Sequence, residues 1–266
     1  MAEPVSVKHL LRNSITQLFV TMKKYSIYYL IIFILSVGFV VSCKDEDEAL
    51  VVNETGTMMD VEGNVYKTVK IGNQWWMAEN LKVTKYRNGT SIAKITDSAD
   101  WVSQNAGAYC EYNNGNGNLK GPGYLYNWKA IVNTEKLVPE GWHIPSDDEW
   151  KTLEKAIGMS AAEADKLTWR GSDEGDKLKS NIQDDWASFG DVFSTNESGF
   201  SALAGSCRLF NSLWGDPGLK STGFWWTSSS YDTDQAWYRY LDYKNSNVFR
   251  SHADQHYGFS IRCVKD

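Results

Sequence analysis

The chain changes character abruptly at Cys43. Residues 25–41 form an apolar run that follows Lys23 and Lys24, and Ser42 and Cys43 separate it from the charged run KDEDE at 44–48. These are the parts of a secretory signal peptide, and the run also approaches the roughly 20 apolar residues of a membrane-spanning helix. Neither structure contributes to a globular core. The fold must therefore come from the residues beyond Cys43, where all 12 Trp lie.

The four residues Val40-Val41-Ser42-Cys43 resemble a bacterial lipobox, in which the signal is cut before a cysteine that receives diacylglycerol. We therefore predict residues 1–42 to be a signal peptide region, with Met22 as the true start. Cys43 is then the lipid attachment site and outer-membrane lipid its partner. Two alternatives stay open, an uncleaved membrane anchor and a real cytoplasmic extension over residues 1–21. A signal or an anchor places the rest outside the inner membrane by the positive-inside rule.

Residues 43–56 are predicted to be an acidic tether, because low hydrophobicity and high charge keep a segment solvated. The run KDEDE also resembles the lysine-plus-acidic export signal of some Bacteroidota lipoproteins. The sequence thus predicts an outer-membrane lipoprotein displayed at the cell surface. A plain solvated tether explains the same charges.

The balance of charge excludes one class of partner. The chain holds 27 Lys and Arg against 33 Asp and Glu, and residues 1–42 take four of the basic and one of the acidic residues. The remainder therefore carries 23 basic and 32 acidic side chains, a net charge of −9. A domain this acidic, with no basic stripe, argues against nucleic acid.

From residue 57 to 266 the composition is uniform, which predicts one domain. Gly72-Asn73 and Asn88-Gly89 are hairpin turn signals. Ser146 and Glu149 form a capping box that opens a helix over 145–158, and further helices are expected at 124–132 and from Ser160. The last third alternates apolar and polar residues, as strands do. Strands, helices, then strands predict an α+β fold of small antiparallel sheets with two or three short helices.

Several ordered blocks resemble the Fibrobacter succinogenes major paralogous domain, a family of secreted and lipoprotein domains, over residues 60–266. The blocks are DVEGNVYKTVKIGNQWWMAENLK (60–82), GAYCEYNN (107–114), YLYNWKAI (124–131), PEGWHIPSDDEWKTLE (139–154), GFSALAGSCR (199–208), FWWTSS (224–229), AWYRYL (236–241) and YGFSIRCVKD (257–266). The resemblance assigns no molecular function. A weaker resemblance, to C-type-lectin-like and formylglycine-generating-enzyme-like domains, implies two helices on a small antiparallel sheet, with the first and last strands paired.

Three cysteines remain beyond Cys43, and an oxidising compartment favours a disulfide between two of them. The family resemblance implies the pair Cys110–Cys263 and leaves Cys207 as a buried thiol. The competing pair is Cys207–Cys263. The formylglycine-generating enzymes use a copper-binding cysteine pair late in the chain, and only Cys263 lies there. That activity is therefore not expected.

No catalytic constellation and no metal site are predicted. His143, Asp147 and Glu149 in HIPSDDE are explained by helix capping and by acidic groups offsetting the helix dipole. His252 and His256 lie four apart, without the further ligands of a zinc site. Clustered oxygens at 172–176 and 232–234 could hold calcium, although polar turns explain them equally well.

The aromatic-rich final strands are the predicted ligand-binding surface. The candidate residues are Trp225, Trp226, Trp237, Tyr238, Arg239 and Tyr240. Such side chains could stack on sugar rings or on a protein partner, although they are more often core. We therefore expect a non-enzymatic, lectin-like domain that binds a glycan or a protein. The alternatives are an envelope enzyme, either a hydrolase or an oxidase, and a structural subunit of a surface or fimbrial assembly.

Overall fold

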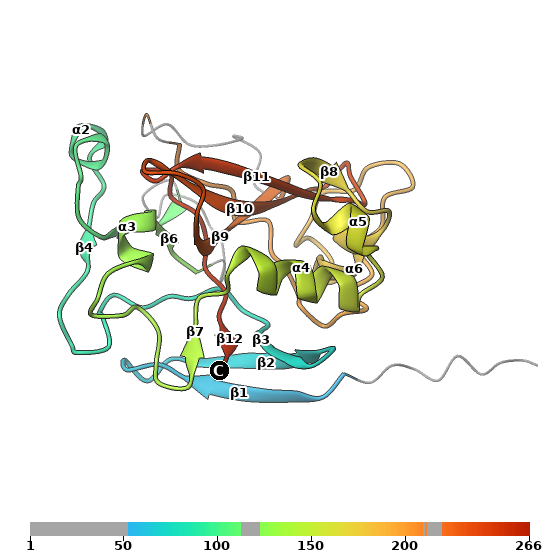
Figure 1. Ribbon diagram of the computed structural model, residues 1–266, viewed down its shortest axis with the longest axis horizontal. Helices are drawn as coiled ribbons and strands as arrows, with labels where there is room; N and C mark the ends of the chain where they lie inside the picture. The colour runs from blue at the N-terminus through green and yellow to red at the C-terminus, as the bar shows by residue number, and fades with distance from the viewer. Residues whose placement is uncertain (1–52, 113–122, 210, 212–219) are drawn as a thin grey trace, which may run out of the picture. The chain divides into compact units, whose positions relative to one another are not determined.

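The computed structural model describes residues 53–112, 123–209, 211 and 220–266 (Figure 1). The predicted signal region, Cys43 and most of the predicted tether lie outside these residues, which begin at position 53. In chain order the described elements are β1 (Thr55–Met59), β2 (Val65–Ile71), β3 (Gln74–Met77), β4 (Ala93–Lys94), α2 (Ser98–Val102), β5 (Ala108–Cys110), β6 (Leu125–Tyr126), α3 (Trp128–Ile131), β7 (Trp142–His143), α4 (Asp147–Ala156), α5 (Ala161–Ala164), β8 (Thr168–Arg170), α6 (Glu174–Leu178), β9 (Thr222–Ser230), β10 (Gln235–Asp242), β11 (Val248–Asp254) and β12 (Val264–Lys265).

These strands form three small sheets. Their orders are β1-β2-β3-β12-β7, β8-β11-β10-β9 and β4-β5-β6. Among the named strands of the described ranges, only β4 and β5 pair in parallel. The predicted α+β class, with mainly antiparallel sheets and short helices, is confirmed, although the described ranges hold five short helices rather than two or three. No helix in those ranges combines the length and the apolar character needed to cross a membrane.

Strand β12 lies inside the five-stranded sheet. Val264 pairs with Trp76 of β3 on one side and with His143 of β7 on the other. The predicted pairing of the first and last strands is wrong, because β1 pairs with β2 and lies at the edge of the sheet. The C-terminal stretch therefore joins elements from both the early and the middle parts of the chain.

Helix α4 begins as the sequence predicts. The Ser146 side chain accepts a hydrogen bond from the Glu149 backbone N–H, and the Glu149 carboxylate accepts from the Ser146 N–H, which completes the capping box. Trp150 and Leu153 lie on the buried face. They share one cluster with residues of β2, β3, β9, β10, β11 and β12. This helix therefore packs between the five-stranded and four-stranded sheets (Figure 1).

The predicted turn at Gly72-Asn73 joins β2 to β3. Gly72 has a φ of +58°, which L-residues with a Cβ rarely adopt. A Cβ at this position would also lie only 2.9 Å from the Cβ of Ala156, the last residue of α4. Position 72 therefore requires glycine for two reasons, the positive φ of the turn and the close approach of the hairpin to the helix.

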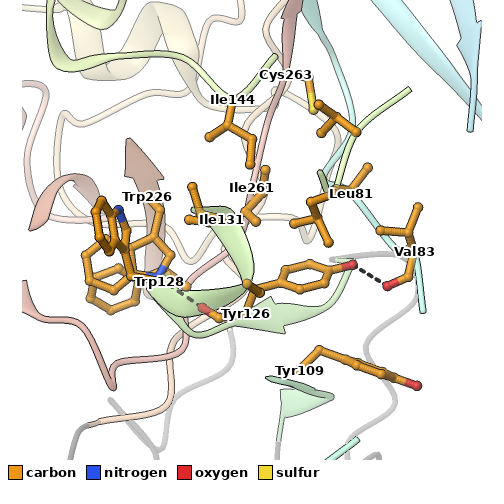
Figure 2. Packing of buried hydrophobic residues seen from close by; sticks show 14 of the residues in the cluster. Leu81, Val83, Tyr109, Tyr126, Trp128, Ile131, Ile144, Trp226, Ile261 and Cys263 are labelled. Carbon is orange, nitrogen blue, oxygen red and sulfur yellow. Dashed lines mark hydrogen bonds between the residues drawn. The ribbon is translucent and has the colours of Figure 1, made fainter. Parts of the chain in front are cut away.

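A second cluster lies around Tyr126 of β6 (Figure 2). The Tyr126 hydroxyl donates to the Val83 carbonyl at 2.8 Å, and the Trp226 indole N–H donates to the Tyr126 carbonyl at 2.9 Å. Buried Tyr and Trp need such partners for their polar atoms. These bonds connect β6 with β9 and with the segment that follows β3.

Candidate functional site

A cavity of about 620 Å³ opens on the four-stranded sheet, on the side of Tyr238 and Tyr240. It lies where β9, β10 and β11 meet the segment before β12. Its lining mixes aromatic rings with polar groups. The lining residues are Cys207, Leu209, Thr222, Phe224, Gln235, Tyr238, Tyr240, His252, Ala253, Asp254, Tyr257 and Phe259.

The strand period places the rings on one face. Phe224 of β9 lies directly opposite Tyr240 of β10, and directly opposed residues of an antiparallel pair share a face. Their ring centroids are 4.6 Å apart with the planes 13° from parallel. Phe259 also stacks against Phe224, with the ring centroids 5.2 Å apart. The cavity wall is therefore a set of rings braced against one another.

The hydroxyls of Tyr238 and Tyr257 at the cavity are neutral at physiological pH. Burial raises the pKa of Tyr238 to about 12, and burial is also the main cause of the raised pKa of Tyr257. The Tyr240 hydroxyl donates to the Asp242 carboxylate at 2.5 Å. Protonated phenols both donate and accept hydrogen bonds, so they suit a ligand that carries hydroxyl or amide groups.

Further polar atoms lie around the cavity. One oxygen of Asp254 accepts from the His256 backbone N–H and contacts His256 Nδ1, each at 2.8 Å. The Gln235 side-chain oxygen is bonded to His252 Nδ1. The Thr222 hydroxyl is buried and has no hydrogen-bond partner among the described residues. A buried hydroxyl without a partner is costly, and a bound ligand group would relieve that cost.

The opposite face of the same strands is held by buried ion pairs. Arg239 of β10 contacts Glu154 at 2.6 Å and Asp147 at 2.7 Å, both from α4. Arg250 of β11 also contacts Asp147 at 2.7 Å, and Arg170 of β8 contacts Glu154 at 2.8 Å. These contacts fix the positions of three adjacent strands against one helix, and so fix the aromatic face on their other side.

The pKa of Asp147 shows how strongly the neighbouring arginines stabilise its charged form. Burial alone would raise the pKa of its carboxyl group. The guanidinium groups of Arg250 and Arg239 outweigh burial and hold the pKa well below its usual range. This carboxylate therefore stays ionised as a structural group.

Of the six predicted binding residues, the structure brings only Tyr238 and Tyr240 into the cavity. Trp225, Trp226 and Arg239 are buried, and none of them lines the cavity. The indole N–H of Trp225 donates to Asn80 Oδ1 at 2.9 Å, and Figure 2 shows Trp226 within the core around Tyr126.

Trp237, the remaining predicted binding residue, is half-buried on the face of Arg239. The Arg250 guanidinium lies over its ring at 3.9 Å. It therefore points away from the rings of Tyr238 and Tyr240, because side chains alternate along a strand.

Sequence reasoning missed half of the aromatic wall and its polar neighbours. Phe224 and Phe259 each follow a glycine in the sequence, and Gln235, Asp254 and Tyr257 flank predicted strands. The alternation along β9 was the available signal. It separates Phe224 and Trp226 from Trp225, but it does not say which of the two faces is covered.

The predicted Cys110–Cys263 disulfide is absent from the described structure, where both are free, buried thiols. Cys110 ends β5 and lies in a small cluster with Trp101, Ala108 and Leu125, whereas Cys263 lies in the large cluster around Tyr126. Burial raises the pKa of Cys110 to about 11 and that of Cys263 further still. Both are therefore unreactive thiols. Cys207 is buried at the cavity wall.

The other candidate polar residues have structural partners. His143 Nε2 lies 2.7 Å from Glu149 and Nδ1 lies 2.6 Å from Asp266. Burial lowers the pKa of His143, but these two carboxylates outweigh it and raise the pKa above its ordinary value. Asp232 accepts from two backbone N–H groups of its own turn. Across the described ranges, no group of three or more His, Cys, Asp or Glu could hold a metal ion.

Comparison with known proteins gives one family. The model described as the Fibrobacter succinogenes major domain matches residues 69–265, which include every residue of the cavity. Neither the curated proteins nor the solved structures gave a match.

Proposed function

The chain belongs to the Fibrobacter succinogenes major domain family, which confirms the resemblance in its sequence, and on this premise we propose that it is a lipid-anchored envelope protein whose domain binds a glycan. The observation that carries the proposal is the aromatic cavity on the four-stranded sheet. Its volume falls within the range of roughly 300–1,000 Å³ typical of ligand sites.

The chemistry of the lining favours a sugar. Tyr238, Tyr240 and Tyr257 offer ring carbons together with hydroxyls, and the polar residues Gln235 and Asp254 also line the cavity. A sugar ring has apolar C–H faces edged by hydroxyls, so it matches a site that alternates in the same way. Large aromatic rings contribute most of the contact area in such sites, and the few polar groups set orientation.

The anchor rests on the sequence. Cys43 follows a complete signal, and the acidic run after it would hold the domain away from the lipid surface. Display at the cell surface and a lectin-like architecture are parts of the same proposal. Mass spectrometry of the mature protein tests the anchor, since we expect an N-terminal diacylated Cys43. A mature chain that keeps residues before Cys43 would contradict it.

Binding is tested with the domain on a glycan array and then by calorimetry with the best ligand. Replacement of Tyr240 by Ala should weaken binding about tenfold, or about 1.4 kcal/mol. Phe193→Ala is the matched control, because Phe193 is 65% exposed and does not line the cavity. The proposal fails if the array shows no ligand, or if both variants lose affinity equally.

A further inference from the structure

The wall of the cavity holds one polar group that the free protein leaves unsatisfied. Thr222, the first residue of β9, is 5% exposed and lines the cavity. Its hydroxyl is buried and has no hydrogen-bond partner among the described residues. Buried hydroxyls are normally paired, because an unpaired one has lost its bonds to water without compensation. The Thr222 hydroxyl therefore marks a position at which a ligand atom can supply the missing partner.

Strand register places the Thr222 side chain on the aromatic face of the sheet. Thr222 lies two residues before Phe224 on β9, so the two side chains share a face. It also lies directly opposite Asp242 of β10, just as Phe224 lies directly opposite Tyr240. Phe224 and Tyr240 line the cavity themselves. The side chain of Thr222 therefore belongs to the same wall as these two rings.

Apolar groups lie beside this end of β9. The Ser206 N–H donates to the Thr222 carbonyl at 2.8 Å, so the segment that follows Ser206 starts next to Thr222. Two residues of that segment, Cys207 and Leu209, line the cavity. Both pack in the same apolar cluster as Phe224. The unpaired hydroxyl thus adjoins an apolar part of the cavity wall.

The hydrogen-bonding capacity of the hydroxyl favours an acceptor group on the ligand. A sugar hydroxyl would bring a donor of its own, and that O–H would need a second partner beside an apolar part of the wall. A carbonyl oxygen only accepts, so it pairs with the Thr222 O–H and leaves no donor unpaired. In an acetamido group this carbonyl is bonded to a methyl group, which suits contact with Cys207, Leu209 and Phe224.

We propose that the cavity selects sugars that carry an N-acetyl group, and that Thr222 is the residue that determines this selectivity. The inference rests on the proposed glycan binding and adds the class of sugar. The Thr222 hydroxyl donates to the acetamido oxygen, and the acetamido methyl group packs against the apolar part of the wall. A change of χ1 from one staggered position to another turns the hydroxyl from its buried position toward the ligand.

Calorimetry with the unaltered protein tests the class of sugar. N-acetylglucosamine is compared with glucosamine and glucose, and N-acetylgalactosamine with galactosamine and galactose. We expect at least one N-acetylated sugar to bind about tenfold more tightly than its two counterparts, because only the acetamido group supplies both the acceptor and the methyl group. Equal affinity within both sets, or a best array ligand without an N-acetyl group, would overturn the selectivity while glycan binding in the cavity stands.

Thr222→Val then removes the hydroxyl and keeps the shape of the side chain. Affinity for the N-acetylated sugar should fall about three- to tenfold, and affinity for its two counterparts should stay unchanged. The midpoint of urea unfolding should not fall, because the hydroxyl has no partner among the described residues of the free protein.

Thr227→Val is the matched control on the same strand. The Thr227 hydroxyl is buried and accepts from the Ser229 N–H at 3.1 Å, and Thr227 does not line the cavity. This variant should lower the unfolding midpoint and leave every affinity unchanged. Thr222→Ser keeps a hydroxyl and should keep the preference for the N-acetylated sugar, which covers the case in which Thr222→Val does not fold.

The outcomes separate this inference from the proposed function. The selectivity is wrongly assigned to Thr222 if Thr222→Val weakens all the sugars equally or leaves the affinity for the N-acetylated sugar unchanged, or if Thr222→Ser loses the preference. If none of the sugars binds the unaltered protein and the glycan array shows no ligand, glycan binding itself is overturned, and the selectivity with it.

Discussion

Glu154 is the group whose replacement should damage the fold most clearly. Its carboxylate is fully buried and accepts from Arg170 Nη2 at 2.8 and 2.9 Å and from Arg239 Nε at 2.6 Å. In Glu154→Leu, Arg239 keeps Asp147 as a partner at 2.7 Å. Arg170 keeps no carboxylate partner among the described residues, and its Nε already has no hydrogen-bond partner there.

The expected loss of stability follows from the Arg170 guanidinium, which stays buried without a carboxylate partner among the described residues. Removing one partner of a buried ion pair costs about 3–5 kcal/mol, because the other charge stays out of water without compensation. A domain has roughly 5–15 kcal/mol in total, so this loss is a third or more of a typical value. In urea unfolding, the midpoint should fall while the slope m stays unchanged.

Two further variants make this reasoning refutable. Glu154→Leu combined with Arg170→Met should recover much of the loss, because an apolar replacement of both partners leaves no stranded charge. Glu54→Gln, which breaks the exposed pair with Lys70, should cost only about 0–1 kcal/mol. A loss for Glu154→Leu no larger than that for Glu54→Gln, or a double variant less stable than the single one, would contradict an uncompensated buried charge at Arg170.

Three smaller effects are expected. His143→Gln should destabilise the protein most below about pH 6.5, the ordinary pKa of histidine. The pKa of His143 is raised in the folded protein, so its contribution to stability is present at low pH and is lost as pH rises through the folded pKa. A stability difference between the two proteins that grows toward pH 8 in urea unfolding would contradict this. Ser146→Ala should cost about 1 kcal/mol in the same assay through loss of the N-cap. A reducing agent should leave the melting temperature unchanged, since Cys110 and Cys263 are free thiols. A large drop in melting temperature would instead support the predicted disulfide.

Local signals predicted local structure well. The capping box at Ser146 and Glu149 opens α4, and Gly72-Asn73 forms the turn between β2 and β3. The stretch from Ser160 was expected to continue as a helix, but α5 ends at Ala164 and β8 begins at Thr168. Strand pairing with β11 overrides helix propensity there, a long-range effect that propensity does not contain.

The candidate binding surface was harder to predict, because it depends on which side of a sheet is covered. Trp225 and Trp226 are neighbours on β9 and point to opposite faces, yet both are buried. α4 and the Phe200 region cover one face, and the Tyr126 cluster covers the other at this point. Arg239 was a candidate binding residue because nothing in its local sequence shows that Asp147 and Glu154 lie across from it. Periodicity shows which residues share a face of a strand, but only the tertiary packing determines which face is covered.

The position of β12 also affects when the domain can fold. Val264 pairs with Trp76 and His143, which lie 188 and 121 positions earlier in the chain. The five-stranded sheet therefore stays in two separate pieces until residue 265 has been synthesised. Contacts between such distant residues make folding slow. If export as proposed begins before residue 265 has been synthesised, the five-stranded sheet is still incomplete and does not have to be unfolded for passage across the membrane.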